Sequence, residues 1–387
     1  RPWSLDLFPL LLDAPTWARL EAGIAQRALL LNTIVADAYG EQQLVRDGVL
    51  PPALIFGHPG YARAMHGYQP PGGVWLPIQA FDLSCDADGN WWVVSQRTQA
   101  PSGLGYLLEN RLIISAQFPD SFAALQIRRV GESYRQLMAG LLARSPKGDR
   151  SRTVLLTPGP YNETYFEHVY LARSLGLTLA EGADLLVRDN HLYLKTLEGL
   201  EPVDIVLRRL DDDFCDPLEL RADSALGVPG LLQAIKAGNV LVANAPGSGF
   251  LESPGLLGFL PPLAEALLGE TLQLPSLPTW WCGEAAVREQ MLGQLADSIV
   301  KPTWPSRNFE PIPGHLMQPG ELDALAARIE AAPDAHCVQQ NLPMMHVPVW
   351  EKRQIAQRAC LLRVYALHDG QKWQVLPGGL ARIASPG

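Results

Sequence analysis

The stretch that decides the fold reads Thr157-Pro-Gly-Pro-Tyr-Asn-Glu-Thr-Tyr-Phe-Glu-His-Val-Tyr-Leu-Ala-Arg-Ser-Leu-Gly176. Before it stands Thr153-Val-Leu-Leu156, a short apolar run that is typical of a buried parallel strand. The prolines on either side of Gly159 predict a sharp turn. Asn162 then predicts the N-cap of a helix that ends at Gly176. We therefore expect a strand–turn–helix unit with polar side chains gathered where the strand ends.

Four polar residues of this unit form a candidate substrate site. Open α/β sheets hold ligands at the carboxyl ends of their strands, which is where these residues are expected to lie. A helix N-terminus attracts anions, but two carboxylates there would repel a phosphate, so the pattern favours an amine or amino-acid substrate. The alternative is a well-capped helix with a solvated acidic face. The four residues are Asn162, Glu163, Glu167 and His168.

A second polar cluster, Arg208-Arg-Leu-Asp-Asp-Asp213, follows the apolar strand expected at 203–207. Two guanidinium groups beside carboxylates can hold both ends of a zwitterion, so Arg208, Arg209 and Asp212 are candidate substrate ligands. The alternative is a surface salt-bridge cluster. Because both clusters follow parallel strands, we expect them to face each other across one edge of the sheet.

Length and composition indicate a globular protein and argue against nucleic-acid-binding and membrane-spanning proteins. The chain has 387 residues, which predicts two or three domains, and 47% apolar with 18% charged residues indicates a globular protein. A net charge of −9 without a basic stripe argues against a nucleic-acid partner. No apolar run of about 18 residues is present, so a membrane span is not expected. Five scattered cysteines without a CxxC pair predict free thiols and a cytoplasmic location.

The pattern along the chain predicts a mixed α/β protein. A long amphipathic helix is expected over 17–39, and a polar linker over 145–152 separates the first block from a βαβ-type region at 153–270. Further expected strands lie at 74–83, 91–94, 177–179, 204–207, 240–243, 298–301, 336–340, 359–367 and 372–376. Further expected helices lie at 121–144 and 321–331, and a hairpin at 185–194.

Two isolated residues are candidate ion contacts. Glu109 follows the glycine-containing turn Pro101-Ser-Gly103 and suits a hard cation, although such turns are common. Lys301 ends an apolar strand, where an ammonium can reach a phosphate, and the alternative is a surface lysine that extends into solvent. The eight histidines form no metal motif, and no GxSxG, P-loop or GxGxxG pattern follows a strand. These absences argue against serine hydrolases, P-loop enzymes and Rossmann oxidoreductases.

Taken together, the segments resemble the circularly permuted ATP-grasp proteins of type 2, relatives of glutathionylspermidine synthase, over nearly the whole chain. The resemblance implies a permuted ATP-grasp fold with three domains, at 1–150, 151–285 and 286–387, of which the middle one is a pre-ATP-grasp βαβ domain. Its most specific motifs are Thr157–His168, Arg208–Pro217, Asp223–Leu231, Asn239–Gly249, Thr279–Gly283 and Pro377–Arg382.

The resemblance also implies an activity, an ATP-dependent carboxylate–amine ligase that works through an acyl phosphate and releases ADP, with Mg²⁺ on the phosphates. Lys301 matches the residue that meets the ATP phosphates, and Gln340 matches the hinge beside the adenine. Arg363 and Arg382 match catalytic arginines that face the phosphates or the acyl phosphate. The implied partners are an amino-acid or small-peptide substrate, an amine, and a helical protein of the alpha-E type.

The metal site departs from the resemblance. Relatives with a complete site carry Glu-Asp-Asn just before the Pro-Ser-Gly turn, where this chain has Ser95-Gln96-Arg97. The expected glycine-rich loop after Lys301 is replaced by the residues at 303–308. Mg²⁺ needs at least one or two carboxylates, and Glu109 and Asp82 are the remaining candidates. The alternative function is therefore a catalytically silent scaffold that binds a peptide or a partner protein.

Overall fold

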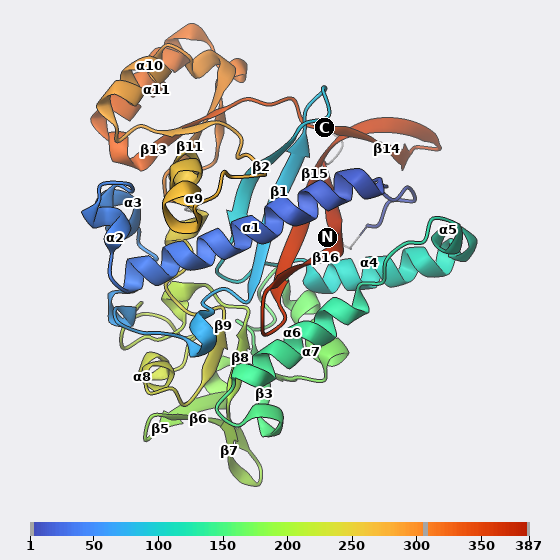
Figure 1. Ribbon diagram of the computed structural model, residues 1–387, viewed down its shortest axis with the longest axis vertical. Coiled ribbons are helices and arrows are strands. Elements are labelled where there is room, and N and C mark those ends of the chain that lie inside the picture. The colour runs from blue at the N-terminus through green and yellow to red at the C-terminus, as the bar shows by residue number, and fades with distance from the viewer. Residues whose placement is uncertain (1–3, 305–308, 385–387) are drawn as a thin grey trace.

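The computed structural model describes residues 4–304 and 309–384. It contains four sheets, arranged along the long axis with a five-stranded antiparallel sheet in the middle (Figure 1). This central sheet has the order β14-β15-β1-β2, and β16 pairs with β15. Its strands are β1 (Ile78–Cys85), β2 (Trp91–Arg97), β14 (His346–Glu351), β15 (Gln354–His368) and β16 (Trp373–Ile383).

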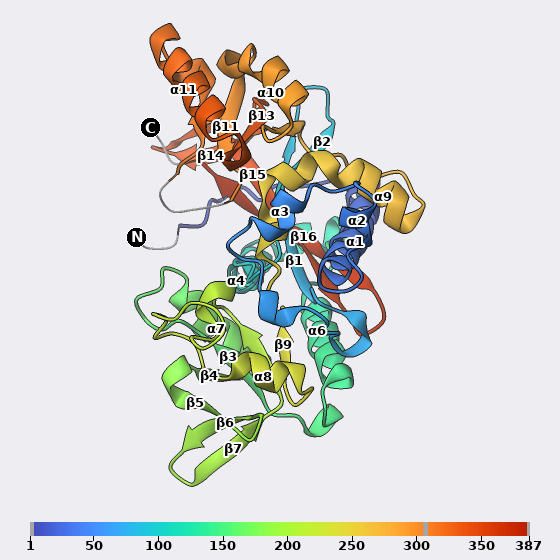
Figure 2. The ribbon, with the colours of Figure 1, turned by 90° about the vertical axis from the view of Figure 1, so that its left-hand side faces the viewer.

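Helices cover both faces of the central sheet, because its side chains alternate between two cores. Phe81 and Leu83 belong to the core that contains α1 (Ala14–Tyr39), while Ile78 and Ala80 pack with α4 (Leu104–Gln117) and α6 (Gly131–Arg144). Figure 2 shows β1 between α1 and α4. Shorter helices complete this part of the chain, namely α2 (Gln43–Arg46), α3 (Pro52–Phe56), α5 (Pro119–Ala124) and α9 (Leu260–Leu268).

A parallel sheet of order β4-β3-β8-β9 lies below the central sheet in Figure 1, next to a three-stranded antiparallel sheet β5-β6-β7. Leu155 and Leu207 of the parallel sheet share a core with Tyr134 of α6. This shared core joins the parallel sheet to the central sheet. The elements are β3 (Thr153–Leu156), α7 (Tyr165–Leu175), β4 (Thr178–Ala180), β5 (Leu185–Arg188), β6 (His191–Thr196), β7 (Gly199–Val203), β8 (Ile205–Arg208), α8 (Leu231–Lys236) and β9 (Leu241–Ala243).

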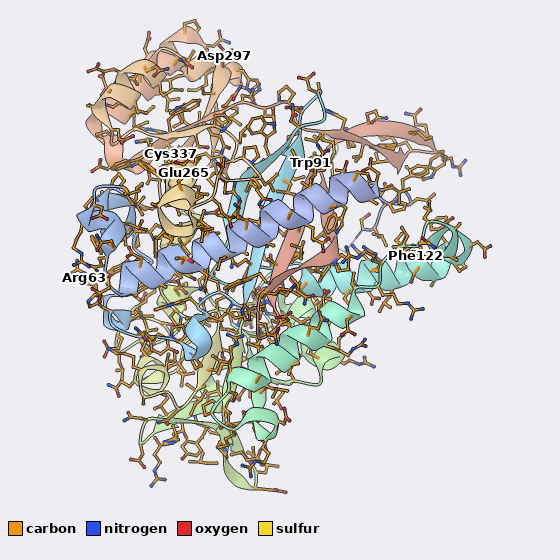
Figure 3. The ribbon with its side chains drawn as sticks, viewed as in Figure 1. Arg63, Trp91, Phe122, Glu265, Asp297 and Cys337 are labelled. Atoms are coloured by element: carbon orange, nitrogen blue, oxygen red, sulfur yellow. The ribbon has the colours of Figure 1, made fainter. Side chains whose placement is uncertain are left out.

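The upper unit, which we define as residues 279–304 and 309–340, lies at the other end of the long axis in both views (Figure 1, Figure 2). It comprises β10 (Thr279–Trp281), α10 (Ala285–Leu292), β11 (Ser298–Pro302), β12 (Ile312–Pro313), α11 (Pro319–Ala331) and β13 (His336–Gln340). Met291, Val300 and Ile329 belong to a core of its own. Figure 3 labels Cys337, a residue of β13 in this unit. Ser253 Oγ, in the segment before α9, donates to Thr303 O of the upper unit at 2.5 Å.

Most predicted elements are confirmed, and the differences have local causes. The helix expected at 121–144 is wrong, because α5 ends at Ala124 and a turn with Gln126 in the left-handed region separates it from α6. Asn162 is not the N-cap of α7. That position is Thr164, and Asn162 Oδ1 instead accepts from the Thr164 N–H at 2.9 Å. The domain limits near 150 and 285 stay a prediction.

All five cysteines are free thiols. Within residues 4–304 and 309–384, no helix is long and apolar enough to cross a membrane.

Candidate functional site

A buried ion pair joins two neighbouring strands of the central sheet, β1 and β15. Asp82 of β1 and Arg363 of β15 are directly opposite in the ladder, and both guanidinium donors reach the carboxylate, Nε to Oδ1 at 2.8 Å and Nη2 to Oδ2 at 2.9 Å. Ser95 Oγ also donates to Asp82 Oδ2 at 2.8 Å. Burial alone would raise the pKa of Asp82, but the hydrogen bonds and charge of Arg363 outweigh it and the pKa lies below its usual value.

Arg97 at the end of β2 extends this pair toward a second carboxylate. Its Nε lies 4.0 Å from Asp82 Oδ2 and its Nη1 lies 3.4 Å from Glu252 Oε2. Glu252 is fixed in turn, because its Oε1 accepts from the backbone N–H groups of Thr98 at 2.7 Å and Gln99 at 2.8 Å. The Arg97 side chain remains 39% exposed, so it is the open edge of this network.

Lys301 approaches the same network from the upper unit. Its Nζ donates to Gln339 Oε1 at 2.5 Å, and Gln339 Nε2 donates to Thr279 Oγ1 at 2.8 Å. Burial, followed by the positive charge of Arg97, lowers the pKa of Lys301 to about 8. We call Asp82, Arg97, Glu252, Lys301 and Arg363 the charged junction. It gathers three cations around two carboxylates, which leaves an excess of positive charge.

The remaining residues expected around a nucleotide lie outside this network. Arg382 is exposed on β16, and its register places it on the same face of the sheet as Arg363. Gln340 is exposed at the end of β13, where its backbone N–H donates to Pro278 O at 2.9 Å. Pro278 also lines a cavity of about 310 Å³ beside β10. It is Gln339, which the sequence did not single out, that contacts Lys301.

The two candidate metal ligands are not brought together. Glu109 forms a hydrogen bond with Tyr170 of α7 and does not turn to Lys301; burial, then this bond, raises the pKa of Tyr170 to about 12. Asp82 is engaged by Arg363 and Ser95. In the part of the chain that the structure describes, no three His, Cys, Asp or Glu side chains form a group that could hold a metal ion. The donor set therefore does not fit Mg²⁺. Residues 305–308, in the segment that replaces the glycine-rich loop, lie outside the described residues.

The two polar clusters at the carboxyl edge of the parallel sheet do lie together, as predicted. Leu156 of β3 and Arg208 of β8 are partners in a parallel ladder, and the Arg209 N–H donates to Leu156 O at 2.8 Å. Thr157, the residue after β3, has its Oγ1 2.9 Å from His168 Nδ1. We call the residues that follow β3 and β8 the sheet edge.

Burial changes what the sheet edge can do. Arg208 is buried and donates to the carbonyls of Asn244 and Leu210, each at 2.6 Å, as well as to the carboxylate of Asp212. Asp212 Oδ2 accepts from the Gly249 N–H at 2.9 Å. The surface salt-bridge interpretation is therefore wrong for this pair. The hydrogen-bonding groups of Arg208 and Asp212 are occupied by partners inside the protein. These contacts therefore do not support direct binding of a zwitterion by this pair.

Glu167 and Arg209 hold a turn from another part of the chain. Glu167 Oε1 accepts from the N–H groups of Gly103 at 2.6 Å and Gly105 at 3.2 Å, at the start of α4. Arg209 Nη2 donates to Pro101 O at 2.6 Å. The next carbonyl, that of Ser102, accepts from the Tyr365 hydroxyl at 2.8 Å and from Arg363 Nη1 at 3.3 Å. This turn therefore connects the sheet edge to the charged junction.

The other sheet-edge candidates divide by exposure. His168 is buried with its Nε2 3.0 Å from Thr164 Oγ1, and burial followed by the charge of Arg209 lowers its pKa to about 3. It is therefore neutral at physiological pH and positions the turn. Glu163 is exposed and Asn162 is half-buried, so both remain accessible to a ligand. Tyr161 and Phe166 are exposed aromatic rings beside them.

Comparisons with known proteins agree with this architecture. A family model described as circularly permuted ATP-grasp type 2 matches residues 9–384. An uncharacterized protein of Mycobacterium tuberculosis is 40% identical over 388 residues, which cover 100% of this chain and 43% of that protein. An uncharacterized protein of Synechocystis is 37% identical over 385 residues, which cover 99% of this chain and 80% of that protein.

Among solved structures, a glutathione synthetase-like effector from Globodera pallida in its apo form matches with a TM-score of 0.62 at 12% identity. The match covers 98% of this chain and 87% of that one, and at this identity it supports the fold alone. The chain spans less than half the length of the mycobacterial relative that is 40% identical to it. The family match and the near full-length identity of these relatives show that the chain belongs to the circularly permuted ATP-grasp type 2 family.

Proposed function

We propose that the chain binds ATP at the charged junction and uses it to join a carboxylate to an amine. The observation that carries the proposal is that Arg97 and Lys301, from different sheets, join Arg363 at only two carboxylates, so that positive charge is in excess. A polyphosphate would supply the missing negative charge. Membership in an ATP-grasp family supports the choice of ATP as that polyphosphate.

In the proposed reaction, a carboxylate oxygen attacks the γ-phosphorus of ATP and ADP leaves. The amine then attacks the carbonyl carbon of the acyl phosphate, an amide bond forms, and inorganic phosphate and a proton are released. Catalysis of this kind depends on positioning and on stabilising the developing negative charge. Arg97 and Lys301 would hold the phosphates, while Arg363, fixed by Asp82, and Arg382 would face the transferred phosphoryl group.

The acceptor side of the proposal rests on the accessible residues of the sheet edge. Glu163 and Asn162 would receive the ammonium group of an amino acid or small peptide, since a carboxylate and an amide oxygen both accept from it. Gln340 would lie beside the adenine. Glu167, His168, Arg208, Arg209 and Asp212 would position this edge without touching the substrate.

A second candidate function has an observation of its own. Arg97 occupies a position where relatives with a complete metal site carry a ligand, and the donor set does not fit Mg²⁺. A scaffold that binds nucleotide, peptide or a partner protein without turnover is consistent with that change. A helical partner protein of the alpha-E type, which the family resemblance implies, stays a proposal.

Thermal unfolding with ATP and assay of ADP release together separate these functions. A ligand present at 100 times its Kd stabilises a protein by about 2.7 kcal/mol, so binding at millimolar ATP should raise the melting temperature measurably. We expect Lys301→Met to reduce that rise, with little effect on the protein without ATP. Lys372→Met, at an exposed lysine before β16, should leave it unchanged.

The outcomes distinguish the two functions. ATP-dependent stabilisation with ADP release in the presence of amino acids and amines supports the ligase. Stabilisation without ADP release across a panel of such substrates supports the scaffold. If millimolar ATP leaves the melting temperature unchanged, the proposal of an ATP site is wrong.

A further inference from the structure

Arg97 lies between the two carboxylates of the charged junction, where a cation would otherwise be expected. One end of its guanidinium group is 4.0 Å from Asp82 Oδ2 and another is 3.4 Å from Glu252 Oε2. The two carboxylates come from different parts of the chain, β1 and the segment before α9. The arginine therefore bridges two oxygen ligands in the way that a divalent ion bridges them in a metal site.

The carboxylates around Arg97 have little capacity left for a metal ion. Both oxygens of Asp82 accept from Arg363, at 2.8 and 2.9 Å. Oε1 of Glu252 accepts two backbone N–H bonds, at 2.7 and 2.8 Å. Mg²⁺ demands near-ideal octahedral oxygen coordination and would also be repelled by the guanidinium charge. Asp82 and Glu252 therefore do not form a magnesium site, because most of their oxygens already accept hydrogen bonds from the protein.

We propose that Arg97 supplies the positive charge that a divalent cation supplies in other ATP-grasp proteins, so that polyphosphates bind at the charged junction without Mg²⁺. A guanidinium group is suited to this role because it is always charged and presents several N–H donors to phosphate oxygens. This inference rests on the proposed nucleotide site and adds a property to it. It concerns binding and is independent of whether the protein turns ATP over.

Lys301 supports the same assignment. It approaches Arg97 from the upper unit, and its Nζ is held by the neutral Gln339. The positive charge of Arg97 disfavours the positive charge of Lys301, and an anion bound beside both would offset this repulsion. A phosphate chain placed there would contact both, and 39% of the Arg97 side chain is exposed to receive it.

The test measures the binding of ATP and of inorganic triphosphate by calorimetry, once in EDTA and once in Mg²⁺. We expect both ligands to bind in EDTA with a Kd no more than a few times higher than in Mg²⁺. Arg97→Ala should weaken binding in EDTA by about 10-fold or more, because a charge-assisted hydrogen bond is lost. Arg97→Lys, which keeps the charge, should restore part of it.

Two further variants sharpen the result. Arg152→Ala is the matched control, because the Arg152 side chain is 42% exposed and is paired with Glu201, but it lies at the start of β3, away from the charged junction. It should bind as the wild type does. Arg97→Asp places a negative charge beside Asp82 and Glu252, so this variant should lose the binding of ATP in EDTA.

Each outcome decides the inference. The inference is supported if wild type binds in EDTA, Arg97→Ala weakens that binding by about 10-fold or more, and Arg97→Lys partly restores it. Binding of wild type that requires Mg²⁺ overturns it while leaving the ATP site intact. Absence of binding under both conditions overturns the proposed function and this inference together. Circular dichroism of each variant excludes unfolding as the cause of a loss.

Discussion

At the scale of the residue, burial disfavours the charged form of Lys301, so its protonation state should change when an anion binds beside it. Burial and the charge of Arg97 lower its pKa to about 8, below the value of a lysine in water. At pH 8 about half of the free protein therefore carries a neutral Lys301. A bound anion favours the charged form and raises this pKa again.

Binding of ATP near pH 8 should therefore take up a fraction of a proton, about half at most, and uptake should vanish near pH 6, where Lys301 is already charged. Above pH 8 the affinity should fall as Lys301 loses its proton. Calorimetry in two buffers with different ionisation enthalpies measures the uptake. Lys301→Met should abolish it, whereas equal uptake in that variant would assign the proton to another group.

At the scale of residues, spacing located the polar groups but not their environment. Arg208, Glu167 and His168 were expected near strand ends; Arg208 is the last residue of β8, and Glu167 and His168 lie in the first turn of α7, where His168 contacts the residue that follows β3. Their burial was not predictable, because the residues that cover them are distant in the sequence. Gly103, whose N–H donates to Glu167, is 64 residues away in the sequence, and Pro101, whose carbonyl accepts from Arg209, is 108 residues away. The arrangement of Arg97 between two carboxylates depends on equally distant segments.

At the scale of elements, α4 was not predicted from the sequence, because the start of this helix has no local capping side chain. Its N-cap is Gly103, which offers no side chain to the first N–H groups. The cap comes from Glu167 on α7 instead. By contrast, α1 begins at the local cap Asp13, whose Oδ1 accepts from the Thr16 N–H at 2.7 Å, and most of that helix was predicted.

The turn before α4 gives a sharp test of how elements position the charged junction. Gly103 has a φ of 111°, which favours glycine, and a Cβ at this position would meet the Tyr365 hydroxyl. We expect Gly103→Ala to lower the free energy of unfolding by about 2–4 kcal/mol, through strain and steric overlap. It should also weaken ATP binding, because the adjacent Ser102 carbonyl accepts from Arg363.

Gly131→Ala is the matched control for this substitution. Gly131 is the first residue of α6, and a Cβ there would meet no atom within 4 Å. Its stability should change by less than about 1 kcal/mol, and in the direction of greater stability. Urea denaturation measures both variants. Equal stability of the two would show that the turn tolerates rearrangement and does not fix Arg363.

At the scale of the whole molecule, the central sheet combines the two ends of the chain. Asp82 and Arg363 are partners in neighbouring strands although 281 residues separate them in the sequence. Local patterns predict strands but not such distant pairing, since any two strands with apolar faces can pair. The family resemblance supplied the expectation of a permuted order, and the match over residues 9–384 confirms the family.

The last prediction belongs to the whole molecule, because the proposed ATP site lies between the central sheet and the upper unit. The upper unit has a small core of its own, shares the main core through Trp281 and Cys337, and contacts β2 through Gln339 Nε2, which lies 3.4 Å from Val94 O. A ligand that bridges Arg97 of the central sheet and Lys301 of the upper unit should slow the opening of one from the other. Hydrogen exchange should therefore decrease in β11 and β13 when ATP is added.

The hairpin sheet β5-β6-β7 is the internal control, since it lies at the opposite end of the long axis (Figure 1, Figure 2). Its exchange should not change with ATP, and Lys301→Met should cancel the protection in the upper unit. Protection spread evenly over the whole chain would indicate global stabilisation by a site elsewhere. Protection confined to the sheet edge would move the ATP site from the charged junction to the ends of β3 and β8, and the positive charge of Arg97 and Lys301 would then need another explanation.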